Sequence, residues 1–363
     1  MKVMVGWKKM SKSKIAVIVG IILITVGIIG VIPSGMNMTK AVLLDISNAR
    51  GKNTASNIVV GQERKEIENL KITSKNEDYD SLNIIVKKSN DDTFSIKKQT
   101  SFLDDVNVTY QYDESSKTIA VDTSSKRNNY NFNMVKEGIL KSLYEEAIST
   151  IANGRSMGNN YIEIYVPNRV NIDVDRNSDT SLTITDEEVL GDSLNYNVSY
   201  GDISLPKFNQ CKNININSSN HVILDVREFV NAEKVNIVGN YVSIHSNGKF
   251  TDYNEIDKLP EEINITAGDL YINSYIPMAN KIILDVNSEL NFHMPFNDYN
   301  IYGDITAKSD DLTLVDVNGK VENGRFKGEL STGDMGKVEL IIKSCDYGEI
   351  RNVSKSNLEF DMD

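Results

Sequence analysis

The chain has 363 residues, of which 40% are hydrophobic, and its 39 basic and 51 acidic residues give a formal net charge of −12. A chain of this length buries a sizeable core, as about two domains or as one long all-β unit. The acidic excess repels polyanions, so we expect no nucleic-acid partner.

The positive charge is concentrated at the N-terminus. Residues 1–14 contain five lysines and no acid, which leaves 34 basic and 51 acidic residues in the remainder. The next segment, Ile15–Ile32, has 18 uncharged and almost wholly apolar residues, and as a helix it would be about 27 Å long, near the thickness of a hydrocarbon core. We expect a transmembrane anchor at 15–33 that lies in the lipid bilayer through Ile15–Ile32. The lysines predict a cytoplasmic tail at 1–14 and an extracytoplasmic body.

A cleaved signal peptide is the alternative to a retained anchor. The small-residue cleavage site that it needs is matched only weakly by Thr39-Lys40-Ala41, far beyond the apolar run. Residues 34–66 have glycines, asparagines and serines without sustained periodicity, which is typical of a spacer. We expect the folded body at 67–350 and a polar tail at 351–363.

Period-two alternation dominates the body. Within 161–185, Ile162, Ile164 and Val166 alternate with more polar residues, Pro167-Asn168 interrupts the run, and the alternation then resumes. Such a pattern is typical of strands with one buried face, separated by turn-forming residues. Similar short runs recur evenly from residue 67 onward, which predicts an all-β body.

One segment has a helical period instead. From Met134 to Ala152, apolar residues recur at four-residue intervals, and Asn153-Gly154 follows as a stop. This predicts an amphipathic helix inserted at 134–153. We interpret it as a cap over the β body, because its balanced charges do not resemble a membrane-binding face.

Pairs of apolar runs then repeat. In each unit the second run begins seven or eight residues after the first, and successive units start 21, 28 and 19 residues apart. A unit of this size cannot bury its apolar face by itself. The repetition therefore predicts that the units stack on one another, and hence a β-solenoid. The units begin at Ile214, Val235, Ile263 and Ile282.

The chain resembles the bacterial putative-adhesin family. The resemblance covers about residues 67–345 and is carried by the N-terminal anchor, by SLNIIVKKSNDDTFSIKK, by YIEIYVPNRVNIDVDRNSDTSLTI with its proline break, and by recurring Gly-Asp turns. It rests on alternation and turn residues, not on a catalytic signature. The resemblance implies a right-handed β-solenoid held outside a bacterial membrane.

The two cysteines, Cys211 and Cys345, have neither the spacing nor the number of a disulfide framework or a metal knuckle. We favour buried free thiols, and a long disulfide stays open. The three histidines, His221, His245 and His293, each adjoin an apolar position and should point to solvent, so we expect no zinc site among them.

No residue set predicts a catalytic centre, and we expect neither enzyme activity nor a cofactor. Gly191-Asp192-Ser193-Leu194 matches a short esterase serine motif, but no histidine has the aspartate three positions earlier that the motif's base requires.

One candidate cation site stands out. The spacing of Asp173, Asp175, Asn177 and Asp179 starts like a calcium loop. The rest of the loop fails, because it lacks both the sharp-turn glycine and the bidentate glutamate.

Tyrosines suggest a binding surface. Tyr241 and Tyr271 have the opposite parity from their apolar neighbours, so we expect them to point outward as a partner face for a glycan or a protein. The alternative is that they stack between repeats and stabilise a flat face.

These observations favour a non-enzymatic, membrane-anchored surface module that binds or scaffolds. One alternative is an envelope-stress or regulatory partner of a neighbouring membrane protein, acting through residues 1–38. Another is a polysaccharide-active enzyme with paired carboxylates on neighbouring repeats. Its best candidates are Asp173, Asp175, Asp225 and Asp285.

Overall fold

The structure is a computed structural model, and it describes residues 41–48, 58–63, 66–74, 82–99, 104–127, 144, 147–148, 161–246 and 259–353. The chain divides into two compact units. The first comprises Met1–Ile58, Gln99–Asp105 and Lys126–Asn160. The second comprises Val59–Lys98, Val106–Ser125 and Tyr161–Asp363.

The described part of the first unit includes a helix at residues 41–48. Tyr144, Ala147 and Ile148 are also helical and buried, and the Tyr144 hydroxyl donates to Asp45 Oδ2 at 3.2 Å. The rest of the predicted helix at 134–153 lies outside the described residues.

The predicted anchor, Ile15–Ile32, also lies outside the described residues. Among the residues that are described, no helix is both long and apolar enough to cross a membrane. The expected spacer at 34–66 has regular structure in two places, the helix at 41–48 and strand β1 (Ile58–Glu63). Strands therefore begin earlier than residue 67.

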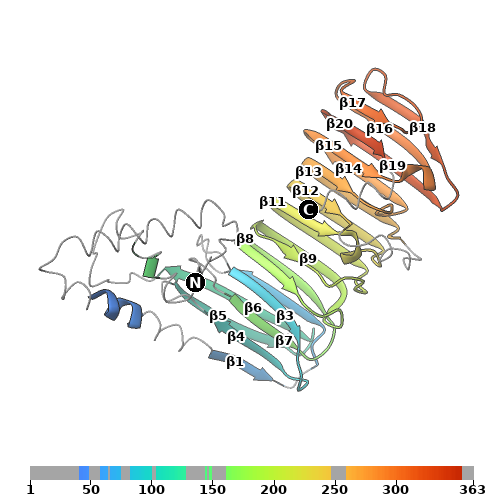
Figure 1. Cartoon of the computed structure of the whole chain (residues 1–363). Coiled ribbons are helices and arrows are strands. Elements are labelled where there is room, and N and C mark those ends of the chain that lie inside the picture. The colour runs from blue at the N-terminus through green and yellow to red at the C-terminus, as the bar shows by residue number, and fades with distance from the viewer. Residues whose placement is uncertain are drawn as a thin grey trace, which may run out of the picture. The chain divides into compact units, whose positions relative to one another are not determined.

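The second unit is a stack of strands (Figure 1). Across the described residues, twenty strands are linked by hydrogen bonds, which confirms the prediction of a mostly β body. In addition to β1, the strands are β2 (Asn69–Ser74), β3 (Leu82–Lys88), β4 (Phe94–Gln99), β5 (Asp104–Asp113), β6 (Thr118–Arg127), β7 (Tyr161–Val166), β8 (Val170–Ile184), β9 (Leu190–Tyr200), β10 (Ile203–Ser204), β11 (Asn213–Asp225), β12 (Lys234–His245), β13 (Glu262–Asn273), β14 (Lys281–Val286), β15 (Glu289–Met294), β16 (Asn300–Thr306), β17 (Leu312–Val315), β18 (Arg325–Thr332), β19 (Lys337–Ser344) and β20 (Tyr347–Asn352).

The long strands β11, β12 and β13 are parallel and each has two arms. In β11 the first arm is Asn213–Ser218 and the second is His221–Asp225, with a register shift between Ser218 and His221. The next level of the stack divides these arms between two strands, because β14 pairs with the first arm of β13 and β15 with the second. We call one first arm with its second arm a rung.

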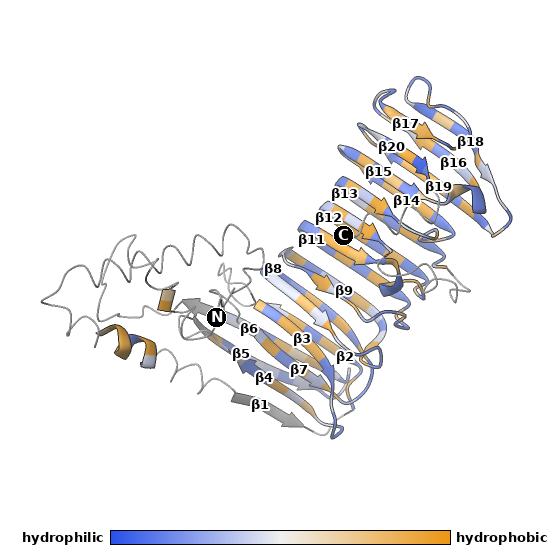
Figure 2. Ribbon diagram, in the orientation of Figure 1, coloured by the Kyte–Doolittle hydropathy of each residue, from blue (hydrophilic) through white to orange (hydrophobic). Residues whose placement is uncertain are grey.

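Equivalent positions on successive rungs hold aliphatic side chains, and apolar and polar residues alternate along strands such as β11, β12 and β13 (Figure 2). In the first arm, Ile214 pairs with Val235, Val235 with Ile263 and Ile263 with Ile282. All four are at most 1% exposed. Stacking at about 4.8 Å per rung lets each side chain cover the next, and full burial contributes about 1.5–3 kcal/mol per side chain. The predicted repeat units are therefore confirmed as rungs. In the second arm the equivalent column is Val222, Val242, Leu270 and Leu290.

At both ends the order of the rungs differs from the order of the sequence. At the C-terminal end, β14 and β15 pair with β19 and β20, and these pair in turn with β16 and β17. The last two strands are thus inserted between two earlier rungs, and β18 pairs antiparallel with β16. At the N-terminal end, β2 pairs with both β6 and β8, and β3 with both β7 and β8.

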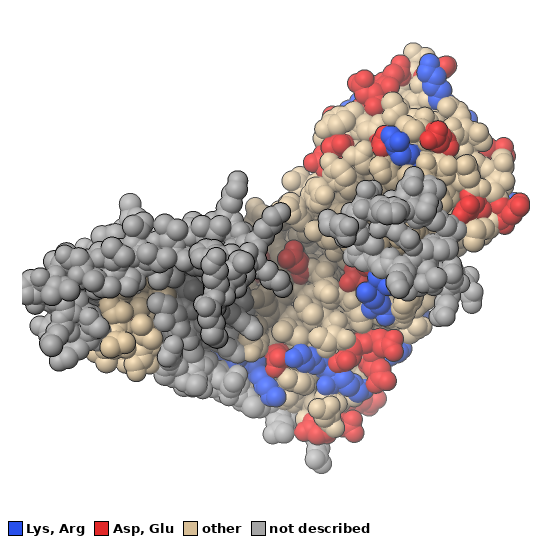
Figure 3. Space-filling view, viewed as in Figure 1, with Lys and Arg blue, Asp and Glu red and all other residues tan. Residues whose placement is uncertain are grey.

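The surface of this unit carries charges of both signs. In Figure 3, Lys and Arg side chains lie among Asp and Glu side chains on the face shown. Several form ion pairs between strands, such as Lys87 with Glu163 at 2.6 Å and Lys327 with Asp304 at 2.5 Å. The pair of Lys327 and Asp304 is exposed, and exposed pairs each contribute about 0–1 kcal/mol, so burial in the core dominates the stability.

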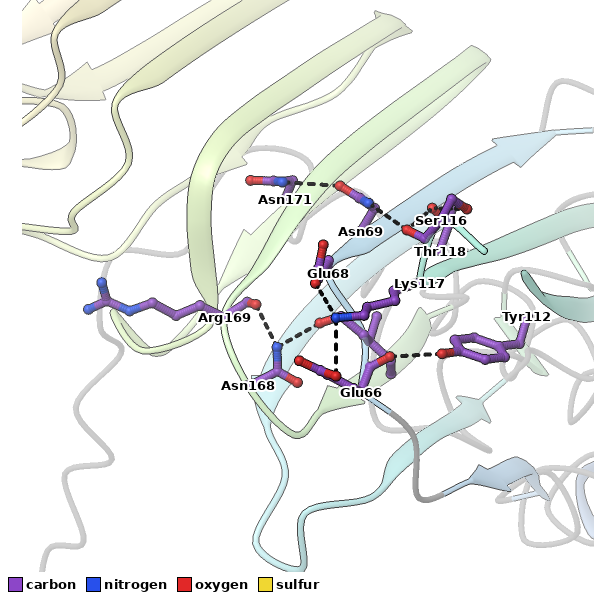
Figure 4. Close-up of polar contacts among 11 residues, drawn as sticks. Glu66, Glu68, Asn69, Tyr112, Ser116, Lys117, Thr118, Asn168, Arg169 and Asn171 are labelled. Atoms are coloured by element: carbon purple, nitrogen blue, oxygen red, sulfur yellow. Dashed lines mark hydrogen bonds and ion pairs between the residues drawn. The ribbon is translucent and has the colours of Figure 1, made fainter. Parts of the chain in front are cut away.

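Polar side chains hold the beginning of β2 between its two neighbours (Figure 4). Lys117 Nζ lies 2.6 Å from Glu68 Oε1. Asn69 donates to the backbone carbonyl of Ser116 at 3.1 Å and accepts from Asn171 Nδ2 at 3.0 Å. Because these contacts reach the chain on both sides of β2, they fix its register in the stack.

The cysteines occupy the core. Cys211 and Cys345 are both free and buried, as favoured from the sequence. Burial raises the pKa of Cys211 to about 12 and that of Cys345 to about 11, so both thiols stay protonated at neutral pH.

Candidate functional site

The outward side chains of the second arms form a face that combines aromatic, histidine, amide and carboxylate groups. We call it the second-arm face, and it is built by β11, β12, β13, β15 and β20. Its first column holds His221, Tyr241 and Asp269. Its second column holds Ile223, Ser243, Tyr271, Asn291 and Glu349. Its third column holds His245, Asn273, His293 and Arg351.

Aromatic rings stack along one part of this face. The ring centroids of His221 and Tyr241 lie 5.0 Å apart, and those of Tyr241 and Tyr271 lie 5.2 Å apart with an angle of 30° between the ring planes. Both tyrosines are half-buried. The expected outward direction is confirmed, and the tyrosines also stack between rungs, as the alternative interpretation expected. Their role toward a partner stays a prediction.

A groove of about 420 Å³ adjoins the aromatic rings and includes Tyr271 in its lining. In the second column Tyr271 is followed on the next rung by the smaller Asn291, and this drop in side-chain size opens the groove. Its lining residues are Ser243, Tyr271, Ile272, Asn273, Asn291, His293 and Glu349.

Glu289 fixes one wall of the groove. Its two carboxylate oxygens accept hydrogen bonds from the Tyr271 hydroxyl at 2.6 Å and from Asn291 Nδ2 at 2.7 Å. The hydrogen bond to Glu289 raises the pKa of the Tyr271 phenol, and burial adds to the effect. Tyr271 is therefore held both at its hydroxyl and through its ring contact with Tyr241.

Glu349 fixes the opposite wall. It accepts hydrogen bonds from Arg351 Nε at 2.9 Å and Nη2 at 2.8 Å, and His293 Nε2 lies 2.7 Å from its Oε1. The hydrogen bonds from Arg351 keep the pKa of Glu349 below its usual value, and the contact with His293 acts in the same direction. Between these walls, Asn273 Oδ1 is buried and has no hydrogen-bond partner among the described residues.

The three histidines all lie on the second-arm face, but they do not converge. His245 and His293 share the third column with Asn273 between them, so their backbones are about 10 Å apart. His221 belongs to the first column. Within the described part of the chain, no cluster of three or more His, Cys, Asp or Glu residues is arranged to hold a metal ion.

The calcium candidate is a strand and not a loop. Asp173, Asp175, Asn177 and Asp179 follow one another along β8, where alternate residues are about 6.6 Å apart. Asp175 accepts a hydrogen bond from Asn197 of the next rung at 2.7 Å. An extended strand does not wrap its side chains around one ion, because these residues follow one another along a line. The sequence spacing alone does not show whether the backbone curves, so the spacing resembled a calcium loop.

The four carboxylates proposed for a polysaccharide-active enzyme do not form a pair between rungs. Asp225 is buried in an ion pair with Arg227 at 2.7 Å. Asp175 and Asp285 share a first-arm column but are five strands apart, or about 24 Å. Paired acid and base carboxyls in glycosidases lie about 5–9.5 Å apart.

The first arms carry an asparagine ladder that the sequence reasoning missed. Asn215 donates to Asn195 at 2.8 Å, Asn236 donates to Asn215 at 2.6 Å, and Asn264 donates to Asn236 at 3.0 Å. The signal was present, because an asparagine directly follows the first apolar residue of three repeat units. Each amide meets the next one, so the ladder uses much of its hydrogen-bonding capacity internally.

Comparisons with known proteins add two structures. No family model matches the sequence, and neither does any curated protein. A putative adhesin from Bacteroides fragilis is 10% identical, with 82% of this chain and 97% of that chain covered and a TM-score of 0.37. A putative cell adhesion protein from Clostridium sporogenes is 10% identical, with 81% and 98% covered and a TM-score of 0.21. Both names agree with the predicted resemblance. TM-scores this low establish neither a shared fold nor a function.

Proposed function

We propose that this chain is a non-enzymatic surface-binding module, anchored in the bacterial membrane, whose extracytoplasmic body is a right-handed β-solenoid. The lengths of the strands and of their connections support the solenoid. A straight strand as long as β11, with 13 residues, would extend about 43 Å. The eight residues from Val226 to Glu233 that lead to β12 span about 28 Å at most. The connection is thus too short to run back along a straight strand to the start of the next one. The two arms of each strand must therefore meet at an angle, and the connection then completes one turn of the coil.

The anchor and the location rest on the sequence. Ile15–Ile32 is long enough to span a bilayer and follows a lysine-rich segment. The acidic remainder of the chain would then be held outside the cell.

The observation that carries the binding role is the second-arm face. It presents an aromatic stack beside a groove on parallel strands, and the side chains of both groove walls are fixed by hydrogen bonds. A rigid face of this kind loses little conformational freedom when a partner binds. The carboxylates of Glu289 and Glu349 already accept fixed donors, which suits positioning better than proton transfer.

Labelling of intact cells tests the location. The full-length chain, with an epitope tag after Asp363, should be accessible to antibody on intact bacteria. A tag that is accessible only after permeabilisation would refute the proposed orientation.

Binding to surfaces tests the role of the face. The purified full-length chain in nanodiscs should capture isolated bacterial envelopes or mucin, and Tyr271→Ala should lower the capture. Tyr302→Ala is the matched control, since Tyr302 is 41% exposed and lies on β16, outside the second-arm face. Equal capture by wild type and Tyr271→Ala would contradict the proposal.

A further inference from the structure

We infer that the groove on the second-arm face binds a short neutral oligosaccharide, with a sugar ring packed against Tyr271 and its hydroxyls bonded to Ser243, Asn273 and Asn291. This inference rests on the proposed surface-binding role and names the chemical class of the ligand.

The charges at the groove favour a neutral ligand. Glu349 is the one carboxylate among the residues that line the groove, and Arg351 engages both of its oxygens. A cationic ligand would compete with this guanidinium, and with His293 at 2.7 Å, for Glu349. An anionic ligand would be repelled by Glu289, whose carboxylate lies 2.6 Å from the Tyr271 hydroxyl and accepts only from the neutral donors Tyr271 and Asn291. Like charges placed next to each other in a binding site oppose binding.

The remaining polar groups suit hydroxyls. Ser243 has a hydroxyl, and Asn273 and Asn291 have amides, so each both donates and accepts hydrogen bonds, as sugar hydroxyls do. Asn291 uses its Nδ2 on Glu289, which leaves its carbonyl oxygen as an acceptor for a ligand. Asn273 Oδ1 has no partner among the described residues but is buried, so a sugar hydroxyl reaches this oxygen only after the amide rotates toward the groove.

The aromatic wall supplies the apolar contact. Tyr271 lines the groove and is held in place through both its hydroxyl and its ring. A ring that is already immobile offers its apolar surface at little entropic cost. The apolar C–H face of a pyranose provides the complementary surface.

The dimensions suit a short oligosaccharide. The groove volume of about 420 Å³ lies toward the lower end of the range of about 300–1,000 Å³ for small-molecule sites. The groove crosses the rungs of β12, β13, β15 and β20, so a bound chain has rigid strands beneath it along its length.

Calorimetric titration of the full-length chain in nanodiscs tests the ligand class. The neutral probes are cellotriose, mannotriose and triacetylchitotriose, and the charged probes of equal length are trigalacturonate and deacetylated chitotriose. We expect at least one neutral probe to bind at least about tenfold more tightly than both charged probes. Binding of the charged probes alone, or of no probe, would overturn the inference.

Variants test the residues. Tyr271→Ala and Asn273→Ala should each weaken the neutral ligand at least about tenfold, and Tyr302→Ala should leave its affinity unchanged. Tyr271→Phe keeps the ring and loses only the hydroxyl, so its affinity for the neutral ligand should stay within about threefold of wild type. Weak binding by Tyr271→Ala together with near-normal binding by Tyr271→Phe would assign the loss to the missing ring. Unchanged affinity in Tyr271→Ala would refute the assigned position of the sugar.

Treatment of the captured envelopes separates this inference from the proposed function. Capture that depends on Tyr271 should disappear after periodate oxidation of the envelope glycans and survive protease treatment. The reverse result would identify a protein ligand, which refutes the glycan inference and leaves the binding role intact. Absence of capture by the wild-type chain would refute both.

Discussion

Glu228→Gln should remove a pH dependence from the stability of the second unit. Glu228 closes a short 3-10 turn, η1 (Val226–Glu228), and its carboxylate accepts the backbone N–H of Asp225 at 2.9 Å and of Leu205 at 3.1 Å. Burial outweighs these two hydrogen bonds and raises the pKa of Glu228 from 4.5 to about 7. The folded protein therefore disfavours the ionised form of this side chain.

The sign follows from the two pKa values. Below pH 4.5 the carboxyl is protonated, and therefore uncharged, in both the folded and the unfolded state. Above that pH the unfolded chain ionises first, which lowers the free energy of the unfolded state relative to the folded state. Stability is thus lost as the pH rises from about 4.5 to 7 and is constant above that range. Between pH 5 and pH 8 the shift of Glu228 corresponds to a loss of about 2.5 kcal/mol in the free energy of unfolding.

Urea unfolding followed by far-UV circular dichroism at pH 5 and pH 8 measures this loss. At pH 5 the wild-type carboxyl is protonated, but its hydroxyl oxygen still has acceptor capacity. The amide NH2 of glutamine has none and would face one of the two N–H groups, so Glu228→Gln should be less stable than wild type at pH 5 by about 1–2 kcal/mol. At pH 8 the gap should close or reverse, because glutamine does not ionise. Glu187→Gln, at an exposed turn position, is the control that should follow wild type. A variant with the same loss of stability between pH 5 and pH 8 as wild type would refute the reasoning.

Three further substitutions probe the stack, and urea unfolding measures each of them. Asn215→Ala breaks both ladder hydrogen bonds of that side chain and should cost about 1–2 kcal/mol; no change would show that the ladder is not stabilising. Ile237→Ala truncates a side chain that is 1% exposed and should cost about 2–5 kcal/mol, whereas Val238→Ala, at 43% exposure on the same strand, should cost less than about 0.5 kcal/mol. Gly348→Ala and Gly336→Ala share the strain of positive φ, at +136° and +144°, but only the Cβ at 348 would meet a backbone oxygen of the neighbouring strand, at 1.9 Å. Gly348→Ala should therefore be the more destabilising by more than about 1 kcal/mol, and equal effects would contradict the close approach.

The regular middle of the stack could be predicted from the sequence because its information is local. Alternation fixes which side chains point inward, and the similar spacing of two apolar runs in each unit fixes the register of one unit on the next. The spacing alone therefore aligns Ile263 and Leu270 with Val235 and Val242, and the strand pairing has this register. The same parity argument placed Tyr241 and Tyr271 on the outside.

The groove could not be predicted, because one of its walls comes from the rung that is out of sequence order. β20 lies next to β15 although the four strands β16, β17, β18 and β19 intervene in the sequence. β17, the next second-arm strand after β15 in the sequence, lies beyond β20 in the stack, and periodicity does not decide which of the two strands follows β15. Only the insertion of β20 brings Glu349 within 2.7 Å of His293, which is 56 residues away.

The two outward faces of the stack differ in what they leave available to a partner. In one column of the first arms, asparagine follows asparagine from β9 to β13, so each amide bonds to its neighbour and the column becomes a self-contained ladder. On the second arms the residue type changes at every rung, from tyrosine to asparagine to glutamate in one column. Neighbours of unlike size and chemistry leave a hollow and unused hydrogen-bonding capacity. Side chains on the second-arm face also point away from the core, so this face tolerates changes of ligand specificity without a change in the aliphatic columns that hold the rungs together.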